Sequence, residues 1–302
     1  MKNDPTILSV LIGLFVLSFV FFVIERLVGR GRKQAIIRKG WWTDVLYWIF
    51  TPLVTKQTTK LLVIIPALVL VLTHVTSVDA LKAGAYRGFG PLSRLPLWLQ
   101  AVMIFVQADF IGYWSHRLFH GRHFWPFHAV HHSSEELDWL GSVRVHPVND
   151  FVSKLAQVTP LLLMGYNVFA TLSAATFFTL YAIFLHANVN WDFGPLRNVI
   201  ASPAFHRWHH SKDKAAWDKN FAGLLPFWDI LFGTYYMPKG RWPENFGIYE
   251  PMPKSFFGQL WEPFAWLYRL NKRSTLVFPS VVEPPNSSIA AAEHSKNIEL
   301  AR

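Results

Sequence analysis

Cysteine is absent from this chain of 302 residues. Its absence excludes disulfide bonds and thiolate-bound metals, so any metal site must use nitrogen and oxygen ligands. Two catalytic patterns are also missing. The sequence contains no H-E-x-x-H string of the zinc hydrolases and no strand-anchored G-x-G-x-x-G of flavin or nicotinamide domains. Redox chemistry in such a chain requires electrons from a separate protein.

Charged residues are scarce, at 16%, whereas hydrophobic residues make up 52% of the chain. The formal net charge of +10 could indicate nucleic acid as a partner. However, much of the basic excess lies beside the first apolar segment, between residues 26 and 39. That placement is the positive-inside pattern of membrane proteins. We therefore expect an integral membrane protein without a nucleic-acid partner.

Apolar segments predict an all-α fold with three full spans, at 7–24, 61–78 and 95–114. The first segment lacks a small-residue cleavage site, so we expect a retained helix and not a signal peptide. The apolar stretch 151–187 lies between two groups of histidines. If these histidines share one site, the stretch must be a short helical hairpin that turns near 165–167. A cytoplasmic, histidine-rich helical cap completes the predicted fold.

Composition divides the chain into four predicted parts. Residues 1–94 contain the N-terminal membrane helices and an interfacial linker, and residues 95–240 contain the catalytic domain. Residues 241–270 form a C-terminal cap segment. Residues 271–302, with Pro-Pro, Ser-Ser and an alanine run, are predicted to be a disordered tail.

Histidines are concentrated in the catalytic part, where eleven of the thirteen fall between residues 116 and 210. The pattern H-x-x-H-H occurs twice, at 128–132 and 206–210, and a further pair lies at 116 and 120. Spacings of three and four return to one face of a helix. Eight convergent imidazoles exceed the needs of one tetrahedral ion, which predicts a two-metal centre. A membrane zinc hydrolase and a divalent-metal transport or binding protein are the alternatives.

These boxes resemble those of the fatty acid hydroxylase/sterol desaturase superfamily. The resemblance rests on His116-Arg-Leu-Phe-His120, His128-Ala-Val-His131-His132, Arg144-Val-His146-Pro147, His206-Arg-Trp-His209-His210, Asp218-Lys-Asn220-Phe and Trp228-Asp-Ile-Leu-Phe-Gly-Thr234. It covers roughly residues 100–240. It implies a membrane diiron enzyme that uses dioxygen and two external electrons to hydroxylate or desaturate a lipid. The partners implied are a lipid from the bilayer and a separate electron-donor redox protein.

The same resemblance implies a set of metal ligands. They are His116, His120, His128, His131, His132, His206, His209 and His210, with His186 as the isolated histidine between the second and third boxes. Some members have another histidine four residues after that one, where this chain has Asn190. His146 could supply the additional imidazole, and a hydrogen-bonded loop histidine explains it equally well.

Three residues are predicted to support the metal ligands without binding the metals themselves. Asp109 lies seven residues before His116 and therefore on the same helix face, where it could accept a hydrogen bond from a metal-bound imidazole. An ion pair with Arg117 or Arg144 is the alternative for this carboxylate. Asn190 and Asn220 are the other two candidates. His74 and His123 are not expected to bind metal.

The predicted cofactor is a pair of non-haem iron ions. Zinc is possible in a purified form, because imidazole discriminates poorly among these metals. No endoplasmic-reticulum retrieval signal occurs, which favours a bacterial inner membrane over the endoplasmic reticulum, with the active site on the cytoplasmic side. The boxes indicate the chemistry and leave the lipid open.

Overall fold

The structure is a computed structural model that describes residues 7–28, 33–79 and 87–274. These ranges are helical, and their only β-type pairing is an isolated antiparallel bridge between Ser211 and Phe246. The α-helices are α1 (Ile7–Val23), α2 (Trp41–Leu72), α4 (Leu97–Phe119), α5 (Trp125–His132), α6 (Pro147–Leu163), α7 (Val168–His186), α8 (Pro203–His209), α9 (Phe227–Leu231) and α10 (Phe256–Ser274). Shorter helical turns cover Ile24–Val28, Leu92–Arg94, Trp139–Val143, Gly194–Asn198 and Lys214–Ala216.

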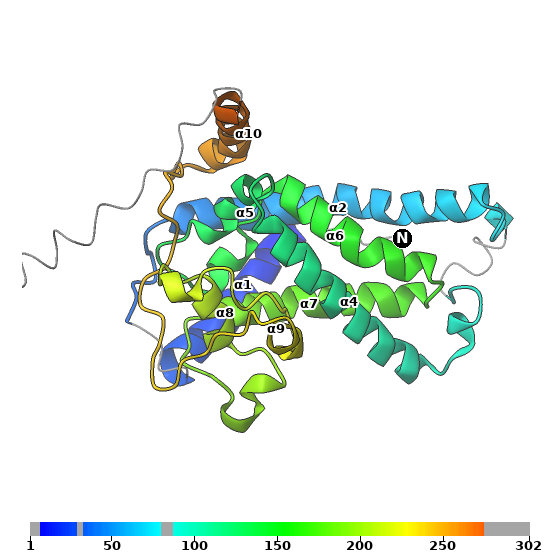
Figure 1. The fold of residues 1–302 in the computed structure, drawn as a ribbon, viewed down its shortest axis with the longest axis horizontal. Coiled ribbons are helices and arrows are strands. Elements are labelled where there is room, and N and C mark those ends of the chain that lie inside the picture. The colour runs from blue at the N-terminus through cyan, green and yellow to red at the C-terminus, as the bar shows by residue number, and fades with distance from the viewer. Residues whose placement is uncertain (1–6, 29–32, 80–86, 275–302) are drawn as a thin grey trace, which may run out of the picture. The chain divides into compact units, whose positions relative to one another are not determined.

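Four long helices form a bundle in which α6 packs on α2, which runs in the same direction, and on α4 and α7, which run in the opposite direction (Figure 1). Helices α2 and α6 begin at the end of the bundle where α4 and α7 finish. The core between α4, α6 and α7 contains Ile104, Ala108, Leu161 and Ala174, with the turn residue Tyr166. Because α4 and α7 finish together, His116 and His186 reach the same end of the bundle.

The predicted hairpin is formed by α6 and α7, which turn at residues 164–167. Gly165 has φ +83°, a left-handed conformation that favours glycine. Its carbonyl accepts the Phe89 N–H at 2.9 Å, and a Cβ at this position would overlap the Phe89 carbonyl oxygen. The Asn167 side chain then caps α7 by accepting the Ala170 N–H at 3.0 Å.

Three helices are long and apolar enough to cross a membrane: Ile7–Leu27, Leu97–Phe119 and Val168–His186. The expected number of spans is correct, but the expected second span at 61–78 is wrong. Its helical part is the end of α2, which continues through Pro52 and Pro66 and stops at Leu72. Thr73 bonds back to the Val69 carbonyl with its N–H and its hydroxyl, and His74 has φ +57°. The third candidate span is instead the second arm of the hairpin.

The end of α1 is attached to the same end of the bundle as the histidines. A Glu25 carboxylate oxygen accepts the N–H groups of Trp139, at 3.4 Å, and Asn188, at 2.8 Å. Nearby Arg38, from the basic stretch 26–39, is buried in ion pairs. In the predicted tail, residues 271–274 are the last residues of α10, and 275–302 lie outside the described residues.

Candidate metal centre

Each histidine box occupies a short helix or the end of a long one. His116 and His120 lie at the end of α4, and His186 is the last residue of α7. The two H-x-x-H-H boxes lie on and directly after α5 and α8, which both begin with a proline in the first turn. Ser202 caps α8 by accepting the Phe205 N–H at 3.2 Å. Proline and the cap favour helix initiation, which turns the i, i+3 and i+4 histidines to one side.

Nine histidines gather into two groups at this end of the bundle. Within each group the candidate ligand nitrogens all lie within 4.8 Å of one another. The five-histidine group contains His116, His120, His128, His132 and His209. The four-histidine group contains His131, His186, His206 and His210. Each H-x-x-H-H box therefore contributes to both groups.

The Nε2 atoms converge in both groups. His128 Nε2 lies 3.1 Å from the Nε2 atoms of His116 and of His132. In the other group, His186 Nε2 lies 3.1 Å from that of His131 and 3.2 Å from that of His206. Two imidazole nitrogens bound to one ion at about 2.0–2.1 Å lie roughly 3.0–3.4 Å apart. The observed separations therefore fit a bound metal ion.

Two further nitrogens of the five-histidine group support this fit. The Nε2 atoms of His120 and His209 are buried and have no hydrogen-bond partner in the described part of the chain. A buried nitrogen without a partner is unfavourable unless a ligand takes its lone pair. The donor set of neutral nitrogens suits iron or zinc equally well.

The opposite ring nitrogens explain why Nε2 faces inward. His116 Nδ1 donates to the Phe221 carbonyl at 2.8 Å, and His209 Nδ1 donates to the Lys219 carbonyl at 2.7 Å. The other donations from Nδ1 go from His128 to Asn149 Oδ1, from His131 to the Arg144 carbonyl and from His186 to the Ala182 carbonyl. A carbonyl oxygen can only accept, so the proton is on Nδ1 and the Nε2 lone pair is available to a metal.

His120 differs, because a carboxylate supports it. Its Nδ1 lies 3.1 Å from Asp218 Oδ1, and the Asp218 side chain is 75% exposed. Burial lowers the pKa of His120, and the Asp218 carboxylate opposes that effect. The hydrogen bond to His120 in turn lowers the pKa of Asp218.

The remaining buried imidazoles outside the candidate spans are neutral. Burial is the largest cause, and neighbouring imidazoles add to it, so that the pKa falls well below the ordinary value of 6.5. This holds for His128, His131, His132, His206, His209 and His210. Neutral imidazole is the form that binds metal.

One loop supports three members of the five-histidine group. Residues 218–221 provide the acceptors for His116, His120 and His209. The next residues are held by two buried carboxylates. Asp229 accepts the N–H groups of residues 221 and 222, each at 2.8 Å, and Asp109 accepts those of residues 224 and 225, also at 2.8 Å.

Asp109 therefore lies near the centre without bonding to a histidine. Its third donor is Trp228 Nε1 at 3.1 Å, so its partners are neither the predicted imidazole nor an arginine. Asn220 is fully buried, with φ +60°, and its side chain bonds to the carbonyls of Phe205 and Tyr236 and to the Tyr236 N–H. It thereby ties the 218–221 loop to α8. Asn190 is exposed.

A network of buried ion pairs lies behind the four-histidine group. Arg144, whose carbonyl accepts from His131, donates from Nε to Asp44 Oδ1 at 2.6 Å. Asp44 also pairs with Arg38 at 2.8 Å, and Arg38 donates to both carboxylate oxygens of Asp138. In the Arg-x-His-Pro motif, the arginine and not the histidine is next to the centre.

His146 lies outside both groups, and both of its ring nitrogens have other partners. Nδ1 accepts the Val148 N–H at 3.2 Å as the N-cap of α6, and Nε2 donates to the Leu260 carbonyl at 3.1 Å. His74 and His123 are exposed and also lie outside the groups. Sequence reasoning missed Asp229, Arg144 and Asn149 as supporting residues. The only indication in the sequence was that Asp229 and Arg144 lie within motifs that carry the family resemblance.

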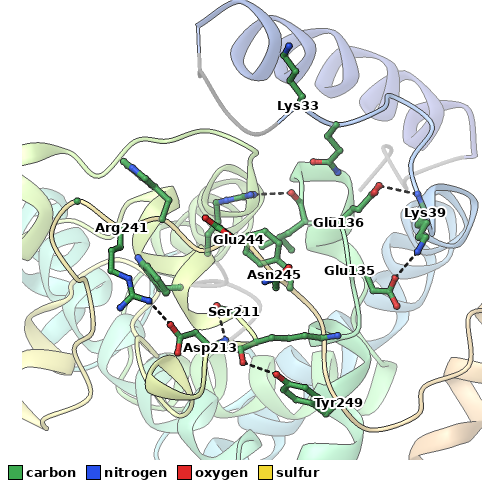
Figure 2. A pocket seen from close by; sticks show the side chains of 18 residues that line it. Lys33, Lys39, Glu135, Glu136, Ser211, Asp213, Arg241, Glu244, Asn245 and Tyr249 are labelled. Atoms are coloured by element: carbon green, nitrogen blue, oxygen red, sulfur yellow. Dashed lines mark hydrogen bonds and ion pairs between the residues drawn. The ribbon is translucent and has the colours of Figure 1, made fainter. Parts of the chain in front are cut away.

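Two cavities adjoin the centre. The smaller, of about 220 Å³, is lined by three members of the five-histidine group, His120, His132 and His209, together with Trp125 and Trp217. The larger, of about 960 Å³, is polar and contains no histidine (Figure 2). Ser211 and Tyr249 line both cavities. The four-histidine group lines neither of them.

Comparison with known proteins gives one family. Residues 101–234 match the model of the fatty acid hydroxylase family. No solved structure gives a significant match.

Three similar proteins illustrate the range of relatives. An ornithine lipid hydroxylase of Rhizobium tropici is 37% identical over 174 residues, which cover 56% of this chain and 52% of the relative. An alkylglycerol monooxygenase of Danio rerio is 35% identical over 134 residues, 44% of this chain and 30% of the relative. A very-long-chain aldehyde decarbonylase of Oryza sativa subsp. indica is 29% identical over 179 residues, 55% and 66% respectively. The chain thus spans about half or less of the length of the first two.

Proposed function

We propose that the chain, whose residues 101–234 match the fatty acid hydroxylase family, is a membrane-bound diiron oxygenase that hydroxylates or desaturates a lipid, using dioxygen and external electrons. The observation that carries the proposal is the convergence of nine buried or half-buried histidine ring nitrogens in two groups. Relatives named as a lipid hydroxylase and an alkylglycerol monooxygenase support a lipid as substrate.

We assign one metal ion to each histidine group. Bound iron would supply the activation of dioxygen with two external electrons and two protons. In hydroxylation one oxygen atom enters the lipid and the other leaves as water, whereas in desaturation the lipid loses two hydrogens and both oxygen atoms leave as water. The chain's own part is to hold neutral imidazoles in place. The carbonyls of Phe221, Lys219 and Arg144 keep the Nδ1 protons away from the metals.

Asp109, Asp229 and Asn220 are assigned as positioning residues. They hold the loop that carries the acceptors of His116, His120 and His209, and none of them touches a metal ligand side chain. His146, expected to be a possible ligand, is assigned as the N-cap of α6 instead. Asn190, which is exposed, has no assigned role.

The small cavity is the proposed route to the reacting centre, because it is lined by three histidines of one group. The four-histidine group is enclosed by protein, which keeps water from it. Electrons are proposed to come from a separate redox protein at the basic, cytoplasmic side of the bundle.

Metal analysis and dioxygen uptake test the proposal. The purified chain should bind about two irons and consume dioxygen when it is reduced. In a bacterial host, deletion should remove one oxygen or add two hydrogens in a single lipid class of the inner membrane. A stable zinc centre that consumes no dioxygen would favour a zinc hydrolase, and reversible metal passage across vesicles would favour a transporter. Either result contradicts the oxygenase.

A further inference from the structure

The large cavity beside the metal centre carries charges of both signs (Figure 2). Nine of its eighteen lining residues are charged, five basic and four acidic. Lys39 and Glu135 lie on one side of the cavity, and Arg241 and Asp213 lie on the other. A lining of a single sign would select a ligand of the opposite charge. This mixed lining instead complements a ligand that bears both an ammonium and an acidic group.

Two ion pairs of the lining are largely exposed. Lys39 Nζ lies 3.4 Å from Glu135 Oε2, and these side chains are 73% and 50% exposed. Arg241 Nη2 lies 3.1 Å from Asp213 Oδ2, with side chains 61% and 32% exposed. Exposed ion pairs of this kind contribute little to stability. A ligand ammonium can therefore replace Lys39 at Glu135, and a ligand acid can replace Asp213 at Arg241, at small cost.

The cavity is a neighbour of the small cavity that forms the proposed reaction site. Ser211 and Tyr249 line both this cavity and the small one that reaches His120, His132 and His209. Helix α8 separates the cavity from the metals, since Trp208 lines the cavity while the neighbouring His209 belongs to the five-histidine group. A molecule that fills both cavities would place one part among the charges and another beside the histidines.

The position of the cavity in the chain favours a lipid over a soluble metabolite. Lys33 and Gln34 line it, and they closely follow the candidate membrane span Ile7–Leu27. Glu25, near the end of that span, is bonded to the same end of the bundle through Trp139 and Asn188. The cavity is thus bordered by chain that has just left the membrane, at the level where lipid headgroups lie.

We propose that the large cavity binds the zwitterionic headgroup of the lipid substrate, with Glu135 facing its ammonium and Arg241 its acidic group. The carbon to be oxidised then lies in the small cavity. This inference rests on the proposed lipid oxygenase function and narrows its substrate class to lipids with both charges.

Four matched amphiphiles test the headgroup. All carry the same acyl chains: an acylated diamino acid with a free ammonium and a free carboxylate, its methyl ester, its N-acetyl derivative, and an uncharged alkylglycerol. Binding to the full-length chain in nanodiscs is measured without added metal, and turnover is measured by mass spectrometry with iron and reductant. The zwitterion should bind at least about tenfold more tightly than each of the other three.

Two conservative variants test the assigned residues. Glu135→Gln should remove the preference of the chain for the zwitterion over its N-acetyl derivative, and Arg241→Gln should remove the preference over the methyl ester. Each variant should weaken zwitterion binding about tenfold and leave alkylglycerol binding unchanged. Lys254→Gln, which removes an exposed charge outside this cavity, is the matched control and should bind like the unaltered chain.

The outcomes separate the two proposals. Equal binding of all four amphiphiles, or a preference for a lipid of one charge only, overturns the headgroup assignment. The same follows if both variants bind the zwitterion normally while their melting temperatures match that of the unaltered chain. Charge-selective binding without oxidation of any amphiphile supports the headgroup site and contradicts the oxygenase function.

Discussion

The five-histidine group and the four-histidine group have the same type of ligand but differ in access and support. The small cavity is lined by three members of the first group and by none of the second. The first is supported largely by the loop 218–225 and its two buried carboxylates, whereas His131 and His186 of the second are supported by the carbonyls of Arg144 and Ala182. Histidine groups of similar composition can therefore occur in two different settings, one beside a cavity and one lining neither cavity.

Removal of one ligand from each group should have the largest effect. We expect His209→Ala and His206→Ala each to reduce bound iron from about two ions to about one per chain, and activity by at least about 100-fold, because the reaction needs both metals. Metal analysis and lipid turnover measure these changes. Loss of both metals from either variant would show that the groups are not independent sites.

Substitution of a supporting carboxylate should affect metal binding in one histidine group and not in the other. Asp109→Asn introduces an amide where the Leu224 and Leu225 N–H groups need acceptors, so the metal affinity of the five-histidine group should fall about 10- to 100-fold. The four-histidine group should retain its metal.

The matched substitution for the four-histidine group is Asp44→Asn, in the ion-pair network next to that group. It weakens the pairing of two buried arginines, Arg38 and Arg144, and should cost up to about 3–5 kcal/mol of stability. Its effect on metal binding should fall on the four-histidine group. Chemical denaturation and metal titration check both variants, and identical metal loss in Asp44→Asn and Asp109→Asn would contradict the separate support of the groups.

Acid should destabilise the metal-free chain. The buried histidines have a pKa well below 6.5 in the folded state, so the unfolded chain binds more protons as the pH falls below that value. The free energy of unfolding is therefore highest above pH 6.5, and it decreases as the pH falls toward the lower pKa values that these histidines have in the folded chain. Melting temperatures between pH 7.5 and 5, roughly spanning this range, should fall steadily. A constant melting temperature would contradict burial of neutral imidazoles.

The smallest effect is expected from Asp218→Asn. The amide oxygen can still accept from His120, but the negative charge is lost, and the side chain is largely exposed to solvent. We expect metal affinity of the five-histidine group to fall by about tenfold or less, and that of the other group to stay constant. Competition with a chelator measures both, and a change confined to the four-histidine group would reverse the assignment of His120.

Sequence reasoning reached those parts of the fold and site that depend on local spacing. The i, i+3 and i+4 intervals identified eight of the nine histidines that the structure brings together, and the isolated His186 came from the family resemblance. The Gly165 region predicted the hairpin turn. The division into two groups was not predictable, because it depends on how α5 and α8 face each other. Asp109 was selected for its helix face, yet its partners lie 115 and 116 residues later. Hydropathy alone also misplaced the second span, since hydropathy does not register that α2 ends after Leu72.

The residues shared by the two cavities have a consequence for how the lining could vary among related sequences. Tyr249 lines both cavities, and its segment is joined to the third histidine box by the Ser211–Phe246 bridge and by the hydrogen bond from the Lys212 N–H to the Asn245 carbonyl, 2.8 Å long. This segment lies beyond residues 101–234, the part that matches the family. Substitutions in this segment would alter one part of the lining of both cavities, including the proposed headgroup residue Arg241, and leave every proposed metal ligand unaltered. Glu135, the other proposed headgroup residue, lies close to the second histidine box instead.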